Sequence, residues 1–364
     1  MKKTAIPGFY KKTPDERLDI ISNIANLNKT ERDALRAELN VDVADGLIEN
    51  TIGTFTLPLG IATNFRINNR DYIIPMVIEE PSVVAAASAG AKATDNVTVT
   101  GGNSHVIGQI QVLNPDADAI AKVLSRKSDI LDAAASILSG HMSVVDVYSS
   151  MLDVQSRMLK VEIVIDTGEA MGANAVNTTC EGLAPIIEEI TGGRVLLRIL
   201  SNAVPGVVSA QAHFKTSDSV ARDIVSAYEF AHIDKLRAVT HNKGIMNGIT
   251  AVAMATGQDT RAIEAAAHMY AAESGVYGPL SKWYMQDDRL CGELHLPIRV
   301  GTVGGLTTHH DTAATCLKIL GNPTSQELAG IMVSVGLCQN FSALRALSTD
   351  GIQKGHMKLH ARRL

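Results

Sequence analysis

Stretches with helically spaced apolar residues alternate along this chain with short stretches in which every second residue is apolar. Near the N-terminus, Thr13-Pro14-Asp15-Glu16 combines a cap residue, a first-turn proline and two acids, which is typical of a helix start. Apolar residues at helical spacing continue that helix through 18–27. The pattern then predicts helices near 30–39 and 85–93, and strands near 54–57, 64–67 and 72–78.

The middle of the chain has the clearest architectural pattern. Two helices, near 116–138 and 169–190, alternate with four strands, near 105–112, 144–148, 159–166 and 194–200. The order β-α-β-β-α-β is that of a ferredoxin-like domain. We therefore predict an α+β protein in which residues 104–211 form a ferredoxin-like domain, inserted into a larger mixed α/β domain.

The pattern after residue 211 is mainly helical, with helices predicted at 217–231, 259–273, 311–320 and 324–335, and a further apolar stretch at 341–347. The Gly- and Asn-rich segment around Lys243 predicts a loop between the first two of these helices. We expect residues 1–103 and 212–345 to form the large domain, with 346–364 following it.

The composition narrows the function classes. Apolar residues make up 46% of the chain and charged residues 20%, which suits a globular protein with aliphatic cores. A net charge of -5 argues against a nucleic-acid binder, because such proteins carry a basic surplus. The longest small and apolar run, 82–91, is too short to span a membrane, and no signal-peptide pattern follows Met1. We expect a soluble cytoplasmic protein whose four cysteines are free buried thiols.

Lys243 is the first candidate for chemistry. Its neighbours in 242–248 supply amide groups and backbone freedom rather than bulk. A lysine there could be an electrostatic catalyst or a Schiff-base nucleophile. A surface lysine in an ordinary Gly/Asn-rich loop would show the same pattern, so spacing alone does not decide.

Other polar residues also allow two interpretations. Glu80 ends an apolar strand, where it is either a solvated strand end or an active-site acid. Asp259 precedes a predicted helix, where capping is the simpler interpretation. His356 and His360 have the i, i+4 spacing of metal ligands, but no third ligand is close by, so we expect no metal. The turn at 166–174 enters a helix with two glycines, which suits phosphate binding, although it is not the Rossmann G-x-G-x-x-G.

Seven segments match motifs of one enzyme family, in that family's order and over nearly the whole chain: 49–53, 57–62, 79–88, 169–174, 241–248, 301–305 and 355–357. On these motifs the chain resembles the 3-hydroxy-3-methylglutaryl-coenzyme A (HMG-CoA) reductases, specifically the soluble prokaryotic class II. The resemblance implies reduction of HMG-CoA to mevalonate and coenzyme A by two hydride transfers from NADH or NADPH. The inserted domain would then be the family's non-Rossmann dinucleotide-binding domain.

The resemblance also implies roles for particular residues. Lys243 would stabilise the negative charge on the former carbonyl oxygen, and Glu80 would donate a proton to it. Asp259 would couple Lys243 and Glu80 by hydrogen bonds, and His356 would protonate the departing thiolate. The substrate acyl group would be held by Ser82, Arg237, Asn247, Gln339 and Asn340. The dinucleotide would be held by Asp132, Glu169, Met171, Gly172, Asn174 and Asn202.

The resemblance also has implications for the oligomeric state and for the C-terminal segment. The resemblance implies a homodimer with a shared active site, assembling to a hexamer, and a C-terminal flap that begins at 346–364 and is cut short here. Glu169 stands where the family usually has Asp, and the match around Asp132 is loose, so NAD and NADP are not separated. Two rivals stay open: a lidless homologue that binds CoA esters with weak activity, and an aldolase that uses Lys243 as a Schiff base.

Overall fold

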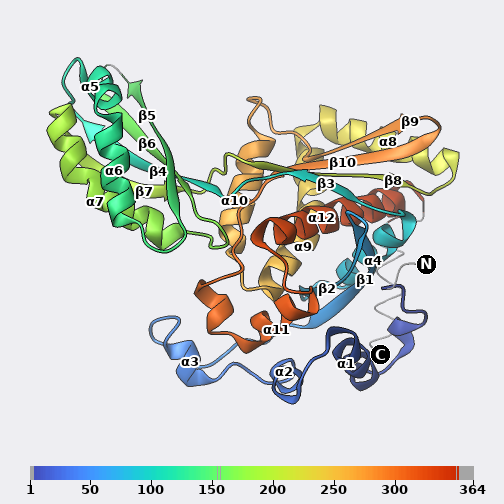
Figure 1. The fold of residues 1–364 in the computed structure, drawn as a ribbon. Coiled ribbons are helices and arrows are strands. Elements are labelled where there is room, and N and C mark those ends of the chain that lie inside the picture. Colours follow the sequence, from blue (N-terminus) through green and yellow to red (C-terminus); the bar gives the residue numbers. More distant parts are fainter. Residues whose placement is uncertain (1–3, 154, 156, 350, 352–364) are drawn as a thin grey trace. The chain divides into compact units, whose positions relative to one another are not determined.

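The computed structural model describes residues 4–153, 155, 157–349 and 351. The chain divides into two compact units (Figure 1). The first consists of Met1–Gly101, Val208–Leu296 and Thr302–Leu364, and the second of Gly102–Val207 and Pro297–Gly301. The second unit therefore includes a short segment that begins 90 residues after Val207, which the sequence pattern did not predict.

The second unit has the predicted β-α-β-β-α-β order. Its elements are β4 (His105–Leu113), α5 (Ala119–Ser125), α6 (Lys127–Ile137), β5 (Ser143–Asp153), β6 (Met158–Asp166), α7 (Ala173–Thr191) and β7 (Arg194–Ser201). The strands form one antiparallel sheet in the order β5-β6-β4-β7, which is ferredoxin-like. The helices lie together on one face of this sheet (Figure 1), and alternate residues of β4 and β6 pack under them in one core. Instead of the single helix predicted at 116–138, the chain forms two that meet at Arg126.

The first unit contains two separate sheets. One is the hairpin of β1 (Leu59–Ile67) and β2 (Arg70–Val77). The other has four strands in the order β3 (Thr98–Gly101), β8 (Val207–Phe214), β10 (Arg289–Pro297) and β9 (Ser281–Gln286). The sequence pattern did not predict this second sheet, and the insertion boundary expected after residue 211 falls inside β8.

Helices make up the rest of the first unit. The N-terminal ones are η1 (Phe9–Lys11), α1 (Pro14–Ala25), α2 (Lys29–Ala34) and α3 (Val41–Asp45). The others are α4 (Val83–Ala93), α8 (Asp218–Ile233), α9 (Lys235–Ala255), α10 (Thr260–Ala271), η2 (Gly305–Thr308), α11 (Asp311–Ile319) and α12 (Ser325–Ser348). The capping boxes at Thr13 and Thr324 form as the sequence predicts.

Helix α12 is the central element of the first unit. Its sequence was expected to form a helix ending near Val335, but the helix continues without a break to Ser348. Among the described residues it is the one helix long and apolar enough to cross a membrane by length and composition, and 83% of that apolar window is buried inside the protein. It is therefore a core helix, and it packs so closely on α4 that a Cβ added at Gly90 would lie 2.1 Å from the Cys338 carbonyl oxygen.

Two local predictions were wrong. Residues 54–57 form no strand, and Phe55 there is 88% exposed, so its apolar pattern does not mark a buried face. Residues around Lys243 form no loop, because 235–255 is one continuous helix, α9. Gly248 in that helix faces α12, where a Cβ would meet Val335 at 3.0 Å. The glycine serves close helix packing rather than a turn.

Candidate active site

Glu80 and Lys243 meet in the first unit although 163 residues separate them. Glu80 lies just after β2, and Lys243 lies in the middle of α9. The Lys243 Nζ donates to Glu80 Oε2 at 2.7 Å, with the two side chains 58% and 33% exposed. At this exposure the pair adds little to stability, and both groups remain accessible to a ligand.

Two asparagines on α9 flank this lysine and hold its surroundings. Asn247, one turn along the helix, places its Nδ2 3.4 Å from the same Glu80 oxygen. Asn242 is fully buried, and its Nδ2 donates to the Tyr277 hydroxyl at 3.1 Å and to the Gly278 carbonyl at 2.9 Å, while its Oδ1 accepts from the Leu280 amide at 2.9 Å. Asn242 therefore joins α9 to the chain segment that precedes β9. The sequence pattern gave Asn242 no role of its own.

Asp259 lies at the N-terminus of α10, where its Oδ1 accepts from the amides of Arg261 and Ala262 at 3.0 and 3.1 Å. This is the capping role that its position in the sequence favours. Among the described residues, Asp259 has no hydrogen bond to Lys243 or Glu80. The expected coupling of the three groups is not present in this arrangement of the side chains.

The remaining predicted substrate residues in the first unit include several polar groups without partners. Ser82 Oγ and Gln339 Oε1 are buried and accept no hydrogen bond from the described residues. Arg237, on α9, is half-buried, and among those residues its guanidinium has no hydrogen bond or ion pair. Burial lowers the pKa of Arg237 from its usual value, because the charged form loses hydration. Buried groups without partners are rare in proteins and are typical of a site that awaits a polar ligand.

Asn340 has a different environment from the other predicted substrate residues. It is 1% exposed, and its Oδ1 accepts from Ser281 Oγ at 2.9 Å and from Trp283 Nε1 at 2.7 Å. His241 joins the same group, with its Nε2 2.6 Å from Ser281 Oγ. Burial, with the charge of Arg237, lowers the pKa of His241 to about 3, so His241 is neutral at physiological pH. This buried network connects α9 and α12 to β9.

In the second unit, the turn before α7 has the features of an anion site. Gly172 is the N-cap of α7, with φ +89°, and a Cβ there would lie 2.3 Å from the Thr167 methyl group. Only glycine fits both constraints. The turn is held by Asp166, whose Oδ1 accepts from the Gly168 amide at 2.9 Å, and this bond together with one from Ser104 lowers the pKa of Asp166. A turn of this kind presents backbone N–H groups at the positive end of a 19-residue helix.

The other predicted dinucleotide residues lie around the same unit. Met171 is half-buried beside Gly172, and the remaining four are exposed: Asp132 on α6, Glu169 in the turn, Asn174 in the first turn of α7, and Asn202 after β7.

With this geometry in place, comparison with known proteins decides the family. The family model for hydroxymethylglutaryl-coenzyme A reductase matches residues 13–361. The chain belongs to the HMG-CoA reductase family. It is 48% identical to the HMG-CoA reductase of Archaeoglobus fulgidus over 377 residues, which covers 99% of this chain and 86% of that one. It is 35% identical to a probable HMG-CoA reductase of Borreliella burgdorferi, with 89% and 79% covered.

Solved structures agree with this assignment. The HMG-CoA reductase of Streptococcus pneumoniae has a TM-score of 0.90 and 38% identity, covering 94% of this chain and 98% of that one. A class II HMG-CoA reductase structure from the same species, bound to NADPH in open conformations, has a TM-score of 0.90 and 37% identity, with 94% and 99% covered. The predicted α+β fold class and the predicted reductase family are confirmed.

His356 lies outside the described residues, so the structure does not place this reductase's predicted thiolate acid. The described part of the chain contains no group of three or more His, Cys, Asp or Glu that could hold a metal ion. All four cysteines are free and buried, as expected. Burial raises the pKa of Cys180 and of Cys316 to about 12, so neither is a reactive thiol.

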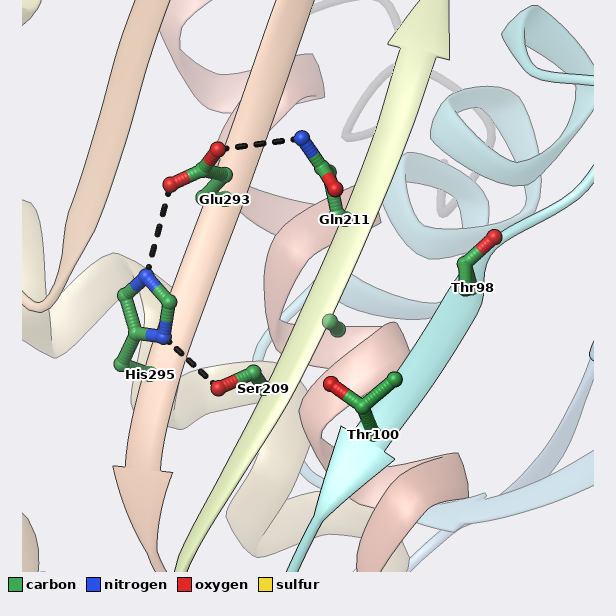
Figure 2. Close-up of a pocket in the computed structure, with 7 residues that line it drawn as sticks. Thr98, Thr100, Ser209, Gln211, Glu293 and His295 are labelled. Atoms are coloured by element: carbon green, nitrogen blue, oxygen red, sulfur yellow. Dashed lines mark hydrogen bonds and ion pairs between the residues drawn. The ribbon is translucent and has the colours of Figure 1, made fainter.

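A pocket lies on the four-stranded sheet of this reductase, away from Lys243 in the sequence, and none of the predicted site residues lines it (Figure 2). Glu293 there accepts from Gln211 Nε2 at 3.0 Å and from the Tyr284 hydroxyl at 2.5 Å, and His295 bridges Glu293 and Ser209 (Figure 2). These polar groups satisfy one another, and the exposed face of an antiparallel sheet is commonly polar. The arrangement is that of a solvated sheet surface.

Proposed function

We propose that this protein interconverts HMG-CoA and mevalonate, with release of coenzyme A, using NADH or NADPH. The observation that carries the proposal is the ion pair of Lys243 with Glu80, with Asn247 beside it, in a chain of the HMG-CoA reductase family. A flexible ammonium and a carboxylate at one point can stabilise negative charge and deliver a proton there. Reduction of a thioester to an alcohol needs both.

Lys243 would act on the oxygen of the reacting carbonyl. A bound nicotinamide supplies hydride to the carbonyl carbon, and negative charge then develops on the oxygen. A fixed cation at hydrogen-bond distance lowers the barrier to that step. The reason is that the cation stabilises the negative oxygen of the transition state more than the neutral carbonyl of the ground state. Glu80, on the other side of Lys243 Nζ, would return a proton to the oxygen as the alcohol forms.

The groups without partners would hold the substrate. Arg237 offers a planar guanidinium for the free carboxylate of the hydroxymethylglutaryl group. Ser82 and Gln339 carry buried oxygens without partners among the described residues, and they would hydrogen-bond its hydroxyl. Asn340 would act differently, by fixing His241 and α9 from within the buried network. His356 would protonate the thiolate of coenzyme A as an imidazolium, since imidazole gains and loses a proton near neutral pH.

The turn at 166–172 and the N-terminus of α7 would hold the pyrophosphate of the dinucleotide. The fit rests on Gly172, which lets the chain enter α7 at a positive φ with the Thr167 side chain packed against it. Asn174, Asn202 and Asp132 would lie along the rest of the cofactor. Glu169, one methylene longer than the family's usual aspartate, would reach further than its counterpart, so the preference for NADH or NADPH needs its own measurement.

We also propose that the protein is cytoplasmic and forms a homodimer with a shared active site, which assembles further to a hexamer. Support comes from large apolar side chains that are exposed in the single chain. Ile52 is fully exposed, and around the junction of α8 and α9 Phe230 is 57%, Ile233 82% and Leu236 75% exposed. Such surfaces are typical of oligomer interfaces.

One assay tests the proposed reaction. The full-length protein, with its native C-terminus, is mixed with HMG-CoA and either NADH or NADPH, and dinucleotide oxidation is followed at 340 nm. We expect oxidation of two equivalents of dinucleotide for each coenzyme A released. Absence of turnover with both dinucleotides would contradict the proposal and would favour a homologue that only binds CoA esters. Borohydride trapping of a substrate on Lys243 would instead support a Schiff-base aldolase.

A further inference from the structure

Arg299 is a buried arginine that neither the sequence pattern nor the resemblance singled out. It is 8% exposed and belongs to Pro297–Gly301, the short segment after β10 that is part of the second unit. Buried arginines are uncommon unless their donors are satisfied, and three acceptors of this one lie in the same turn.

The Arg299 guanidinium forms hydrogen bonds with the turn that leads into α7. Its Nη2 donates to Thr167 Oγ1 at 2.8 Å and to the carbonyl oxygens of Gly168 and Ala170 at 2.5 Å each. Thr167 Oγ1 also lies 3.1 Å from the Ser104 carbonyl and 2.9 Å from that of Ala170. The turn's carbonyls therefore point inward at one cation. The turn is further fixed by its own amides, since those of Thr167, Gly168 and Ala170 donate to the Ser104 carbonyl, to Asp166 Oδ1 and to the Thr167 carbonyl.

Gly301 brings the same segment against the end of the turn. A Cβ at Gly301 would lie 2.6 Å from the Met171 amide nitrogen, so only a glycine permits this approach. Two residues of one five-residue segment thus fix the turn at both of its ends. Burial lowers the pKa of Arg299, but arginine stays charged in proteins, so a permanent positive charge lies directly behind the turn.

We propose that Arg299 is a positioning residue for the dinucleotide: it holds the 167–170 turn so that the N-terminus of α7, which follows the turn, is preorganised for the pyrophosphate. The inference rests on the proposed dinucleotide site. Preorganised donors avoid the cost of ordering a loop on binding, so the effect belongs to dinucleotide affinity rather than to the chemical step.

The test uses the full chain and measures binding of NADH and of NADPH alone, by the change in their fluorescence, together with steady-state kinetics. Arg299→Lys keeps the charge but loses the planar guanidinium, whose Nη2 lies against all three oxygens. We expect it to weaken dinucleotide binding and raise the dinucleotide KM by about tenfold, the effect of losing one to two charged hydrogen bonds. We expect the KM for HMG-CoA to change less than twofold (a small effect on the scale of single contacts). Arg194→Lys, at the exposed far end of β7 from Asn202, is the matched control and should leave both constants unchanged.

The outcomes separate this inference from the proposed function. If the wild type binds either dinucleotide and folded Arg299→Lys binds it equally well, the role of Arg299 is wrong while the proposed function stands. Equal rises in KM for dinucleotide and HMG-CoA would also contradict positioning, because they indicate a general structural loss. If the wild type binds neither dinucleotide, both proposals fail. Should Arg299→Lys not fold, Thr167→Val removes one of the three acceptors, and unchanged affinity in that variant would overturn the inference.

Discussion

At the scale of single residues, the proposal depends on Lys243 and on His356 acting in different steps. Lys243→Ala should lower kcat for HMG-CoA and for free mevaldehyde alike by at least about a hundredfold, because both reductions build charge on the same oxygen. His356→Gln should slow HMG-CoA reduction and largely spare mevaldehyde, which has no thiolate to protonate. Both variants are compared by dinucleotide oxidation with each substrate, with Lys235→Ala on the same helix as control. Equal losses in the two assays for His356→Gln would contradict its role. A fall in kcat of less than about tenfold in Lys243→Ala would contradict the role of Lys243 at the oxygen.

His241 gives a residue-scale prediction about stability. Its pKa is about 3 in the folded protein, below the ordinary value of 6.5, so between these values the unfolded chain binds a proton that the folded chain does not. Stability is then fully present above about pH 6.5 and falls on acidification by up to about 1.4 kcal/mol per pH unit. His241→Gln keeps a hydrogen bond to Ser281 within reach and removes this proton. Urea unfolding at pH 7, 6 and 5 should give a shallower loss of stability in the variant, and identical slopes would show that His241 does not titrate on unfolding.

The sequence predicts individual residues well where the signal is local and poorly where it is not. Asp259 was expected to cap a helix and does so, because a cap depends only on the next three residues. Asn242 looked like a loop residue because its side chain disfavours helices in isolation. Inside the protein its amide is satisfied by Tyr277, Gly278 and Leu280, and this removes the penalty. No local pattern carries that information.

At the scale of elements, two glycines in helices should have opposite effects when replaced. Gly244 lies in α9, and no described heavy atom comes within 4 Å of a Cβ built there, so Gly244→Ala should stabilise the protein by about 0.5–1 kcal/mol. Gly90 in α4 lies against the α12 backbone, so Gly90→Ala should destabilise it by about 1–3 kcal/mol. Chemical denaturation measures both free energies of unfolding. Similar values for the two alanine variants would show that α4 and α12 are not packed as closely as described.

The elements missed by the sequence pattern share a physical cause. Strand β8 buries alternate residues, as a strand with one covered face should, whereas β10 buries residues 290–292 in succession. In β8 the buried positions include Ala210 and Ala212, and alanine is depleted in strands. Their neighbours in the sheet, moreover, come from segments far away in the sequence. The β-α-β-β-α-β unit was predictable because its central strands β4 and β6 alternate strictly and its elements follow one another along one continuous stretch.

At the scale of the whole molecule, the exposed apolar residues near the α8–α9 junction predict assembly. Ile233 is 82% exposed in the single chain, and an aspartate there would bring an unpaired charge into a buried interface, at a cost that a dimer cannot easily offset. The residue lies ten positions before Lys243, so loss of the partner should also remove activity if the site is shared. Ile233→Asp should therefore lower the molar mass measured by light scattering and lower kcat together.

Leu124→Asp provides the comparison, because Leu124 is also exposed, at 55%, but lies on α5 of the second unit. The same change of side chain there should leave the molar mass and kcat as they are. If Ile233→Asp keeps the wild-type mass, the α8–α9 junction is not the interface. If it becomes monomeric but keeps its kcat, the protein assembles through this surface while each chain carries a complete site of its own. Molar mass measured on the sample decides whether the protein is an oligomer. The kcat of the same sample decides whether its active site requires a second chain.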